Sequence, residues 1–243
     1  MPGAERTVIF RELLHPAEIV AMLRLRHRIY FEENGYGVTK PLGLDLTAHD
    51  ACSRLFGVFC DGSLRGGVRV VYRTAQASAM VFGALHAVVD ASAPLTTSPL
   101  LPSEEAFDLA SMPGVVPKDV HAELGRFALE RTAAVPWLAQ RTIRSVVAVL
   151  HAEHCPLYMY SCAKVVAKRY ARVTNPCWTL QQSKRDGIGS DHFVFPKPTI
   201  AAVARPEDAT EGDVLRHYVR QLRRTGMIVL SSEHAVSRES HSG

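Results

Sequence analysis

The sequence predicts a mixed α/β (α+β) domain in which helices flank a single sheet. Two observations support this prediction. The expected elements run helix, antiparallel hairpin, then strand, helix, strand, helix and strand, and the 243 residues are 47% hydrophobic and 21% charged, as in ordinary globular proteins. A chain of this length can bury one sizeable core. We therefore predict a single domain over residues 1–243, with a long insertion at about 75–119 and a polar C-terminal tail from about 231.

The first half of the chain is predicted to form a strand, a helix and a hairpin. Thr7 to Phe10 is a short apolar strand, and the helix lies in "HPAEIVAMLRLRHRIYFEENG", with Pro16 in its first turn and Gly35 at its end. "SRLFGVFCDGSLRGGVRVVYR" has two strand-like runs around Asp61-Gly62, a dipeptide typical of tight hairpin turns. Residues 75–119 are rich in Ala, Ser and Pro, so we expect a long functional or mobile loop with little regular structure.

The second half alternates strands and helices. "AELGRFAL" is predicted as a strand, about Pro136 to His154 as a helix, "CPLYMYS" as a strand and "AKVVAKRYARV" as a helix. Two further strands are expected in "CWTLQQ" and "HFVFP". Glu207 to Arg224 has the spacing of an amphipathic helix and precedes the polar tail.

Charge, cysteine content and hydropathy exclude several classes of protein. A net charge of +4 and a pI near 8.9 favour an acidic partner without requiring nucleic acid, and the basic stretch "RHYVRQLRRTG" has Tyr218 as its single Phe, Tyr or Trp residue. Five cysteines, an odd number without CxxC spacing, indicate reduced thiols and neither a disulfide framework nor a metal site. No apolar run approaches the roughly 20 residues of a membrane span, and "MPGAERTVIF" lacks a signal-peptide layout. We expect a cytoplasmic protein.

Four groups of polar residues are candidates for chemistry. They are Arg26 with Tyr30 and Tyr36; Asp45, His49 and Asp50; Arg69; and Glu123 with Arg126. Each group also has a purely structural explanation: a solvated helix face, turn-forming aspartates, an outward strand residue and a structural ion pair. In a regular strand, Glu123 and Arg126 would lie on opposite faces, unless a bulge near Gly125 re-aims one of them.

The order and spacing of these groups resemble a known signature. "LRHRIYFEENGY", followed by the acidic loop "DLTAHD", then "GGVRVVY", then "ELGRF", looks like the signature of the acyl-homoserine-lactone synthases and of the related long-chain N-acyl amino acid synthases. The resemblance covers roughly residues 20 to 180, and its specificity lies in the combination of motifs. Both groups of enzymes are GNAT-like acyltransferases. The resemblance implies a three-layer fold with a central, mostly antiparallel sheet flanked by helices.

The resemblance also implies roles for the matched residues. Glu123, beside Arg126, would be the base that takes a proton from the amine, directly or through a water. Arg26, Asp50 and Arg69 would form an ionic network that orders the N-terminal helix over the amine site, although a purely structural network has the same pattern. The implied substrate-binding residues are Arg26, Tyr30, Tyr36, Asp45, Asp50, Arg69 and Phe127.

Acyl transfer from a thioester to an amine needs an uncharged amine and a stabilised oxyanion. Free α-amines have pKa values of roughly 7.7 to 8.0, so a base is useful near neutral pH. In this fold class the oxyanion is implied to bind backbone N–H groups where the central strands splay apart. Tyr160 is the candidate to protonate the leaving thiolate, with Ser161 and Tyr170 as alternatives.

Departures from the signature favour the N-acyl amino acid synthase branch. Tyr36 stands where the quorum-signal branch usually has Trp, "RVVYR" stands where that branch has Arg-Leu-Leu-Pro, and the segment between Arg69 and Glu123 is much longer. The GNAT cofactor loop is reduced to "RTAAV" at Arg131, without glycine, which favours an acyl carrier protein thioester over coenzyme A. No permanently bound cofactor is expected. An acidic carrier protein would meet basic residues, for which the candidates are Arg131, Arg141, Arg144, Lys164, Lys168, Arg169 and Arg172.

Three hypotheses follow. The first is an N-acyltransferase that moves a fatty acyl group from acyl carrier protein to the amine of an amino acid or a close analogue. The second is an acyl-homoserine-lactone synthase, which uses S-adenosylmethionine as the amine donor. The third is a non-catalytic acyl-binding or sensor module, and the joint presence of Glu123, Arg126 and Arg69 argues against it.

Overall fold

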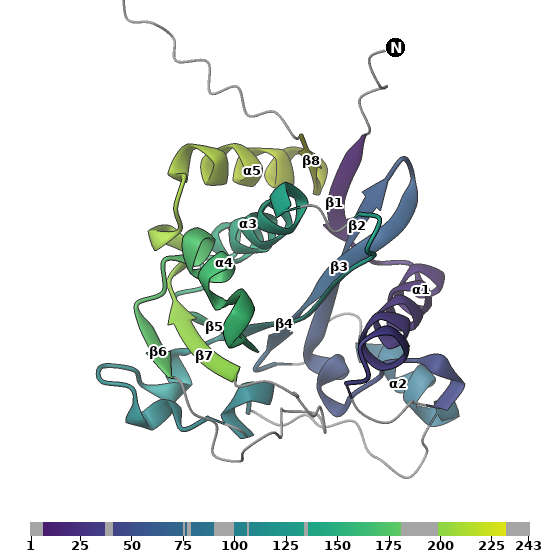
Figure 1. The fold of residues 1–243 in the computed structure, drawn as a ribbon, viewed down its shortest axis with the longest axis horizontal. Helices are drawn as coiled ribbons and strands as arrows, with labels where there is room; N and C mark the ends of the chain where they lie inside the picture. Colours follow the sequence, from purple (N-terminus) through teal and green to yellow (C-terminus); the bar gives the residue numbers. More distant parts are fainter. Residues whose placement is uncertain are drawn as a thin grey trace, which may run out of the picture.

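The strands form a single twisted sheet that runs through the whole molecule. The computed structural model describes residues 7–36, 41–74, 76, 79–89, 100–105, 107–133, 136–180 and 199–231. In this part of the chain an eight-stranded sheet has the order β6-β7-β5-β4-β3-β2-β1-β8 (Figure 1). The strands are β1 (Val8–Glu12), β2 (Ser53–Cys60), β3 (Ser63–Tyr72), β4 (Ala122–Leu129), β5 (Tyr158–Ala163), β6 (Trp178–Leu180), β7 (Thr199–Ala204) and β8 (Met227–Leu230).

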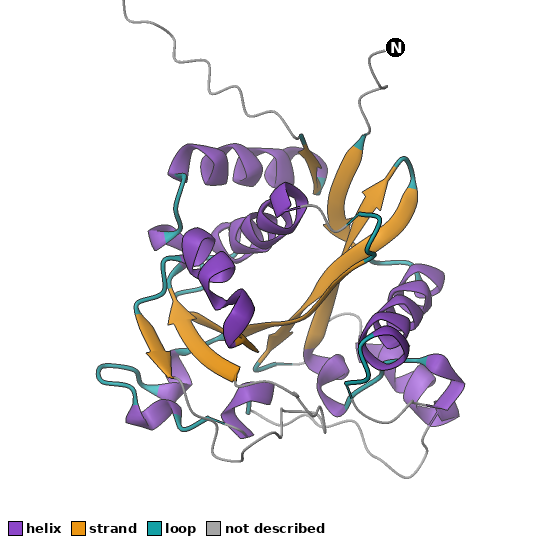
Figure 2. Cartoon of the chain, in the orientation of Figure 1, coloured by secondary structure: helices purple, strands orange, loops and turns teal. Residues whose placement is uncertain are grey.

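Helices cover both faces of the sheet, which gives three layers (Figures 1 and 2). One side carries α1 and α2, and the other carries α3, α4 and α5. The helices are α1 (Pro16–His27), α2 (Ala79–Val89), α3 (Pro136–Ala152), α4 (Lys164–Thr174) and α5 (Gly212–Thr225), together with the π-helix η1 (Arg28–Glu33). The predicted mixed α/β fold with a mostly antiparallel sheet flanked by helices is thus confirmed. Among the helices of the described residues, none has the length and apolar character that crossing a membrane requires.

Side chains on the central strands alternate between two hydrophobic cores. Val70 of β3 and Leu124 of β4 face α3 and α5, in a core shared with Tyr158 and Tyr160 of β5. Val71, the next residue of β3, faces the opposite side, where it packs with residues of the 100–120 segment. This alternation follows from the two-residue period of a strand. In the regular parts of these strands, successive side chains therefore face opposite sides of the sheet.

The sheet opens between β4 and β5, its one parallel pair among the described strands. These two strands are in register only from Ala122 to Leu124, opposite Tyr158 to Tyr160. Beyond this point β4 continues alongside β3, and β5 continues alongside β7. The central strands therefore diverge, and a V-shaped opening begins directly after Leu124 and Tyr160.

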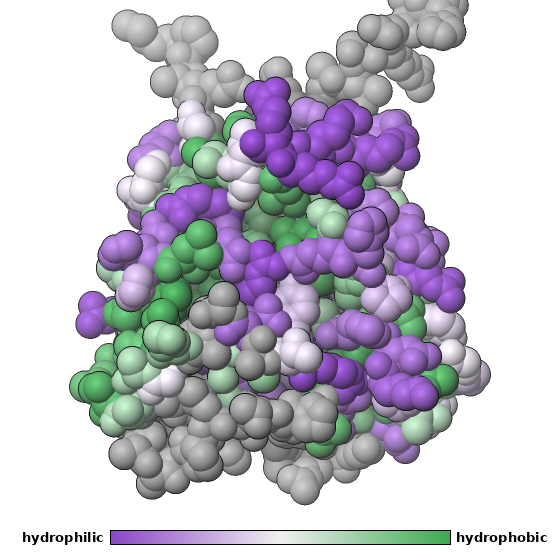
Figure 3. Space-filling view, turned by 180° about the vertical axis from the view of Figure 1, so that it is seen from behind, coloured by the Kyte–Doolittle hydropathy of each residue, from purple (hydrophilic) through white to green (hydrophobic). Residues whose placement is uncertain are grey.

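The 75–119 segment has more regular structure than we predicted. Its described residues form helix α2 and three short 3₁₀ helices, η4 (Pro102–Glu105), η5 (Leu109–Ser111) and η6 (Pro117–Asp119). Leu101, Phe107 and Met112 are buried against the sheet, so the prediction of a loop with little regular structure was wrong for this part. The exposed side chains of α2 include Met80 and Val88, and hydrophobic residues gather on the side of α1 and α2 in the view from behind (Figure 3).

Two strands were missed by the sequence analysis. β7 reads "TIAAVA" and β8 reads "MIVL", and each pairs antiparallel with its neighbour, β7 with β5 and β8 with β1. The predicted strand "HFVFP" and the polar tail from residue 232 lie outside the described residues. The predicted helix and hairpin of the first half are confirmed, with helical structure from Pro16 to Glu33 and a turn at Asp61-Gly62.

Candidate active site

A β-bulge brings Glu123 and Arg126 to the same face of the sheet. The register between β3 and β4 shifts between Gly67 and Arg69, opposite Ala128 and Gly125. Within this shift Arg126 has a positive φ of 51°, which is rare for a residue with a side chain. One additional residue in β4 reverses the alternation after the bulge. Two side chains three positions apart, which a regular strand would separate, therefore face one site.

Beside this bulge lies a buried ionic network. Arg26 of α1 donates from Nε to Asp45 Oδ2 at 2.8 Å and from a terminal nitrogen to the Asp45 carbonyl at 3.0 Å. Arg69 of β3 donates to Asp50 Oδ1 at 3.2 Å and to Thr47 Oγ1 at 2.7 Å. Asp50 Oδ2 in turn accepts the backbone N–H of Thr47 at 2.6 Å. Arg26, Asp45 and Asp50 are completely buried, so the solvated-face explanation of Arg26 does not hold, whereas Asp50 also forms a capping box with Thr47 at the start of the short 3₁₀ helix Ala48–Cys52.

Arg126 joins the network through Asp45, because its Nε lies 3.7 Å from Asp45 Oδ2. Burial by itself raises the pKa of Asp45, but the neighbouring guanidinium groups of Arg126 and Arg26 outweigh it and lower that pKa below its ordinary value. Asp45 is therefore ionised at neutral pH. Three arginines, Arg26, Arg69 and Arg126, thus meet two aspartates, Asp45 and Asp50.

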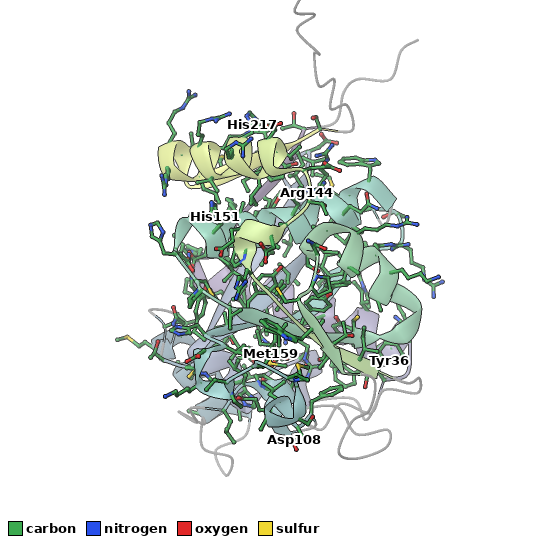
Figure 4. The ribbon with its side chains drawn as sticks, turned by 90° about the vertical axis from the view of Figure 1, so that its left-hand side faces the viewer. Tyr36, Asp108, Arg144, His151, Met159 and His217 are labelled. Atoms are coloured by element: carbon green, nitrogen blue, oxygen red, sulfur yellow. The ribbon has the colours of Figure 1, made fainter. Side chains whose placement is uncertain are left out.

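Tyr30 connects the π-helix η1 to the bulge. Its hydroxyl donates to the Phe127 carbonyl at 2.6 Å, and the Arg126 guanidinium lies 5.8 Å from the centre of its ring. Burial raises the pKa of Tyr30, so the phenol stays protonated. The ring of Tyr36, labelled in Figure 4, lies 6.1 Å from that of Tyr30. The structure thus brings Tyr30, Tyr36, Phe127 and Arg126 close to one another.

Glu123 is held by a residue that the sequence analysis missed. Ser103, in the short helix η4, donates from its backbone N–H to Glu123 Oε2 at 2.8 Å and from its hydroxyl to Oε1 at 2.6 Å. The Ser103 hydroxyl also lies 2.9 Å from the hydroxyl of Ser161 on β5. Glu123 is 3% exposed. No motif around Ser103 indicates this contact, because the two residues are 20 positions apart and meet only through folding of the 100–120 segment.

Open space lies beside the bulge at Gly125. Among the described residues, no atom comes within 4 Å of the position that a Cβ on Gly125 would take. By contrast, a Cβ on Gly67 of β3 would come within 2.2 Å of the Phe56 carbonyl oxygen. Gly125 lies between Glu123 and Arg126 in the chain, directly after the last residue of β4 that pairs with β5. The open space is therefore next to the candidate base and to the opening of the sheet.

Several solved structures have a similar fold, three of which follow. The N-acyl amino acid synthase FeeM from uncultured soil microbes has a TM-score of 0.50 and 16% sequence identity, over 84% of this chain and 93% of its own. The CoA-dependent acyl-homoserine lactone synthase BjaI, with SAM and isopentyl-CoA, has a TM-score of 0.56 and 17% identity, over 88% and 90%. The AHL synthase LasI has a TM-score of 0.51 and 12% identity, over 95% and 100%. The chain has the same overall fold as these three synthases. No protein-family model and no curated protein matches the sequence.

In this fold Tyr160 lies on the face of the sheet opposite to Glu123. Its side chain is 1% exposed, its hydroxyl is 3.1 Å from Thr174 Oγ1, and its ring stacks on Tyr170 of α4 with a centroid distance of 5.0 Å. Burial raises the pKa of Tyr160 to about 12. The structure does not bring Tyr160 together with Glu123 and Arg126, because strand alternation separates them. The prediction that Tyr160 protonates the leaving thiolate was therefore wrong. Tyr160 packs against α4 instead.

The predicted carrier-binding residues fall into two groups. Arg144 is 4% exposed and donates to Glu211 Oε1 at 3.0 Å, and Arg141 lies 3.8 Å from the same carboxylate. Figure 4 places Arg144 beneath α5, so the prediction that these two arginines present themselves to a carrier was wrong. Arg131, Lys168, Arg169 and Arg172 are exposed. Lys164 begins α4, and its side chain lies outside the described part of the structure.

Proposed function

We propose that the protein is an N-acyltransferase that moves a fatty acyl group from an acyl carrier protein thioester to the amine of an amino acid or a related small amine. The observation that carries this proposal is the position of Glu123 and Arg126. A bulge directs both side chains to one face, at the point where β4 and β5 diverge. A base and a cation beside an opening in the sheet are what transfer to an amine requires.

The reaction follows from this arrangement. The thioester lies in the opening between β4 and β5, and its carbonyl oxygen accepts hydrogen bonds from backbone N–H groups of β4 beyond Leu124, where the ladder to β5 has ended. The amine, freed of its extra proton by Glu123, attacks the carbonyl carbon. A C–N bond forms, the C–S bond breaks, the sulfur leaves with the bonding electron pair, and the second proton of the amine nitrogen passes to the sulfur to give the thiol.

The charge of the ionic network supports an amino acid as the acceptor. Among its five members, Arg126 has the highest side-chain exposure, 7%. A substrate carboxylate placed beside Arg126 would accept a charge-assisted hydrogen bond from its guanidinium group. The open space at Gly125 separates Arg126 from Glu123. One small amino acid would then place its carboxylate beside Arg126 and its amine on the side of Glu123, which takes the proton directly or through an intervening group.

A carrier protein as donor is supported by the surface of α4. Lys168, Arg169 and Arg172 are exposed on this helix, whereas Tyr170 packs inward against Phe127 of β4. A basic surface thus lies over the wall of the opening, where an acidic carrier can approach. The segment after β4 includes the exposed Arg131 and has no glycine to approach a diphosphate closely, which disfavours coenzyme A.

The second candidate is an acyl-homoserine-lactone synthase that takes its amine from S-adenosylmethionine. The likeness to BjaI, whose TM-score is the highest of the three solved structures described above, favours it. Tyr36 in place of a tryptophan and the long 75–119 segment favour the amino acid acceptor. A non-catalytic binding module is disfavoured, since a module without chemistry has no need for a base and a buried network at the opening.

Lipid mass spectrometry of cells that express the protein tests the proposal. The wild type is compared with Glu123→Gln, which keeps the shape of the side chain but removes the base, and with Glu207→Gln, a control at an exposed position away from the site. We expect N-acyl amino acids in the wild type and the control, and a loss of roughly 10²- to 10⁴-fold in Glu123→Gln. Acyl-homoserine lactones would support the second candidate, and no new acyl amide in any strain would contradict both.

A further inference from the structure

Ser103 of the 100–120 segment forms a hydrogen bond to the candidate base, Glu123, and the direction of this hydrogen bond is fixed. Ser103 is 1% exposed, and its hydroxyl lies within hydrogen-bond distance of both Glu123 Oε1 and Ser161 Oγ. A hydroxyl has one proton to donate and two lone pairs that accept. Because a carboxylate can only accept, Ser103 donates to Glu123 and accepts from Ser161. The three groups form a directed chain from Ser161 through Ser103 to Glu123.

The exposure of the three side chains shows which end of the hydrogen-bond chain a substrate can reach. Glu123 is 3% exposed and lies beneath Ser103. Ser161 is half-buried and directly follows Tyr160, the last residue of β5 in register with β4. Its side chain lies on the same face as Glu123, because Met159, two residues earlier, pairs with Glu123 across the two strands (Figure 4 labels Met159). Ser161 is therefore the member of the chain at the opening of the sheet.

A second set of contacts fixes Ser103 in this position. The neighbouring Glu104 accepts two hydrogen bonds from the Arg73 guanidinium, at 2.8 and 2.9 Å. The same Glu104 accepts the backbone N–H of Leu101 at 2.6 Å, and Arg73 Nε donates to the Val120 carbonyl at 2.7 Å. Arg73 thus connects the end of β3 to both ends of the 100–120 segment. Ser103 is therefore held in place through Glu104 as well as by its own hydrogen bonds to Glu123.

We propose that Ser161 and Ser103 relay the proton of the amine substrate to Glu123. In the step, the ammonium group of the substrate gives one proton to Ser161 Oγ, Ser161 gives its own proton to Ser103, and Ser103 gives its proton to the Glu123 carboxylate. The neutral amine then attacks the thioester, its second proton goes to the leaving sulfur, and the Glu123 carboxyl group returns its proton to solvent. One thioester and one ammonium ion yield one amide, one thiol and one proton.

The relay rests on the proposed acyl transfer and goes beyond it by assigning Ser161 as a catalytic residue and Ser103 as a positioning residue. The experiment compares steady-state kinetics of the purified wild type with Ser161→Ala, Ser103→Ala, Ser103→Thr and the double alanine variant, between pH 6.5 and 9.5. Ser111→Ala is the matched control, because Ser111 is an exposed serine of the same segment that bonds only locally, to the Asp108 carbonyl. Thermal unfolding of each variant verifies that it is folded.

At pH 7 we expect each alanine variant to lose about 10²-fold in kcat, at the lower end of general-base effects. This deficit shrinks to about 10-fold or less at pH 9.5, because the amine then arrives already neutral. The double variant loses no more than either single variant, since both break one chain, and Ser103→Thr retains activity within about 5-fold because it keeps the hydroxyl.

Three results separate the relay from the acyl transfer on which it rests. Full activity of Ser161→Ala or Ser103→Ala with an unchanged pH profile, while Glu123→Gln is inactive, overturns the relay and leaves the acyltransferase standing. A multiplicative loss in the double variant, or a deficit that does not change with pH, also overturns it. An inactive wild type overturns both proposals.

Discussion

Replacement of Asp45 by asparagine tests the buried network most severely. Asp45 is completely buried and lies 2.8 Å from Arg26 Nε and 3.7 Å from Arg126 Nε. Asparagine has nearly the same shape but no charge, so the variant leaves two guanidinium groups facing a neutral amide. Removal of one partner from a buried ion pair costs about 3 to 5 kcal/mol. For a domain of this size, that corresponds to a fall of about 6 to 20 °C in the unfolding midpoint.

The assay is urea unfolding at pH 7, followed by circular dichroism, together with a thermal scan. Asp213→Asn is the control, because Asp213 forms an exposed pair with Arg216 within α5, and exposed pairs contribute little. We expect the control to unfold at the same urea concentration as the wild type. An Asp45→Asn variant whose unfolding free energy lies within about 1 kcal/mol of the wild type would refute the inference that the network depends on this charge.

Three further predictions follow from the same site. Because the neighbouring guanidinium groups lower the pKa of Asp45, its contribution to stability is complete above about pH 4 and is lost as the pH falls through the lowered value. The free energy of unfolding should therefore fall more steeply with decreasing pH in the wild type than in Asp45→Asn, and equal slopes would contradict this. Gly125→Ala should fold normally but raise KM for a substrate, whereas Gly67→Ala should lose stability because its Cβ meets a carbonyl oxygen; unchanged kinetics in Gly125→Ala would place the substrate elsewhere. Tyr30→Phe removes the hydrogen bond to the Phe127 carbonyl and should cost about 1 kcal/mol in urea unfolding, and a neutral result would mean that this bond does not hold η1 to the sheet.

The motifs of the resemblance indicated which polar residues meet in the candidate site, because each motif specifies both the residue types and their order along the chain. Arg26, Asp50 and Arg69 come from separate parts of the chain, yet the structure brings them into one buried network. The bulge near Gly125, which the sequence left open as an alternative to a regular strand, is present, with the positive φ one residue later, at Arg126. The bulge depends on neighbouring residues and the network residues belong to recognised motifs, so both can be inferred from the sequence alone.

Features that depend on long-range packing were not predictable in the same way. Ser103 contacts Glu123 only because Arg73 and Glu104 hold the segment against the sheet, and no local pattern marks that contact. β7 is short and rich in alanine, which has little strand propensity. Arg144 reads as a basic helix residue, and only the docking of α5 through Glu211 buries it. Tyr160 faces away from the site because of strand alternation, which depends on the register of β5.

The most direct test of the proposed acyl transfer is thiol release by the purified protein. A fatty acyl carrier protein thioester and the matching acyl-CoA are supplied separately with a panel of amino acids, and both free thiol and acyl amide are quantified. We predict amine-dependent release of one thiol for each amide formed, faster with the carrier protein than with coenzyme A, and reduced by at least about 10²-fold in Glu123→Gln. Thiol release that does not depend on the amine, or that proceeds equally well in Glu123→Gln, would contradict the proposed mechanism.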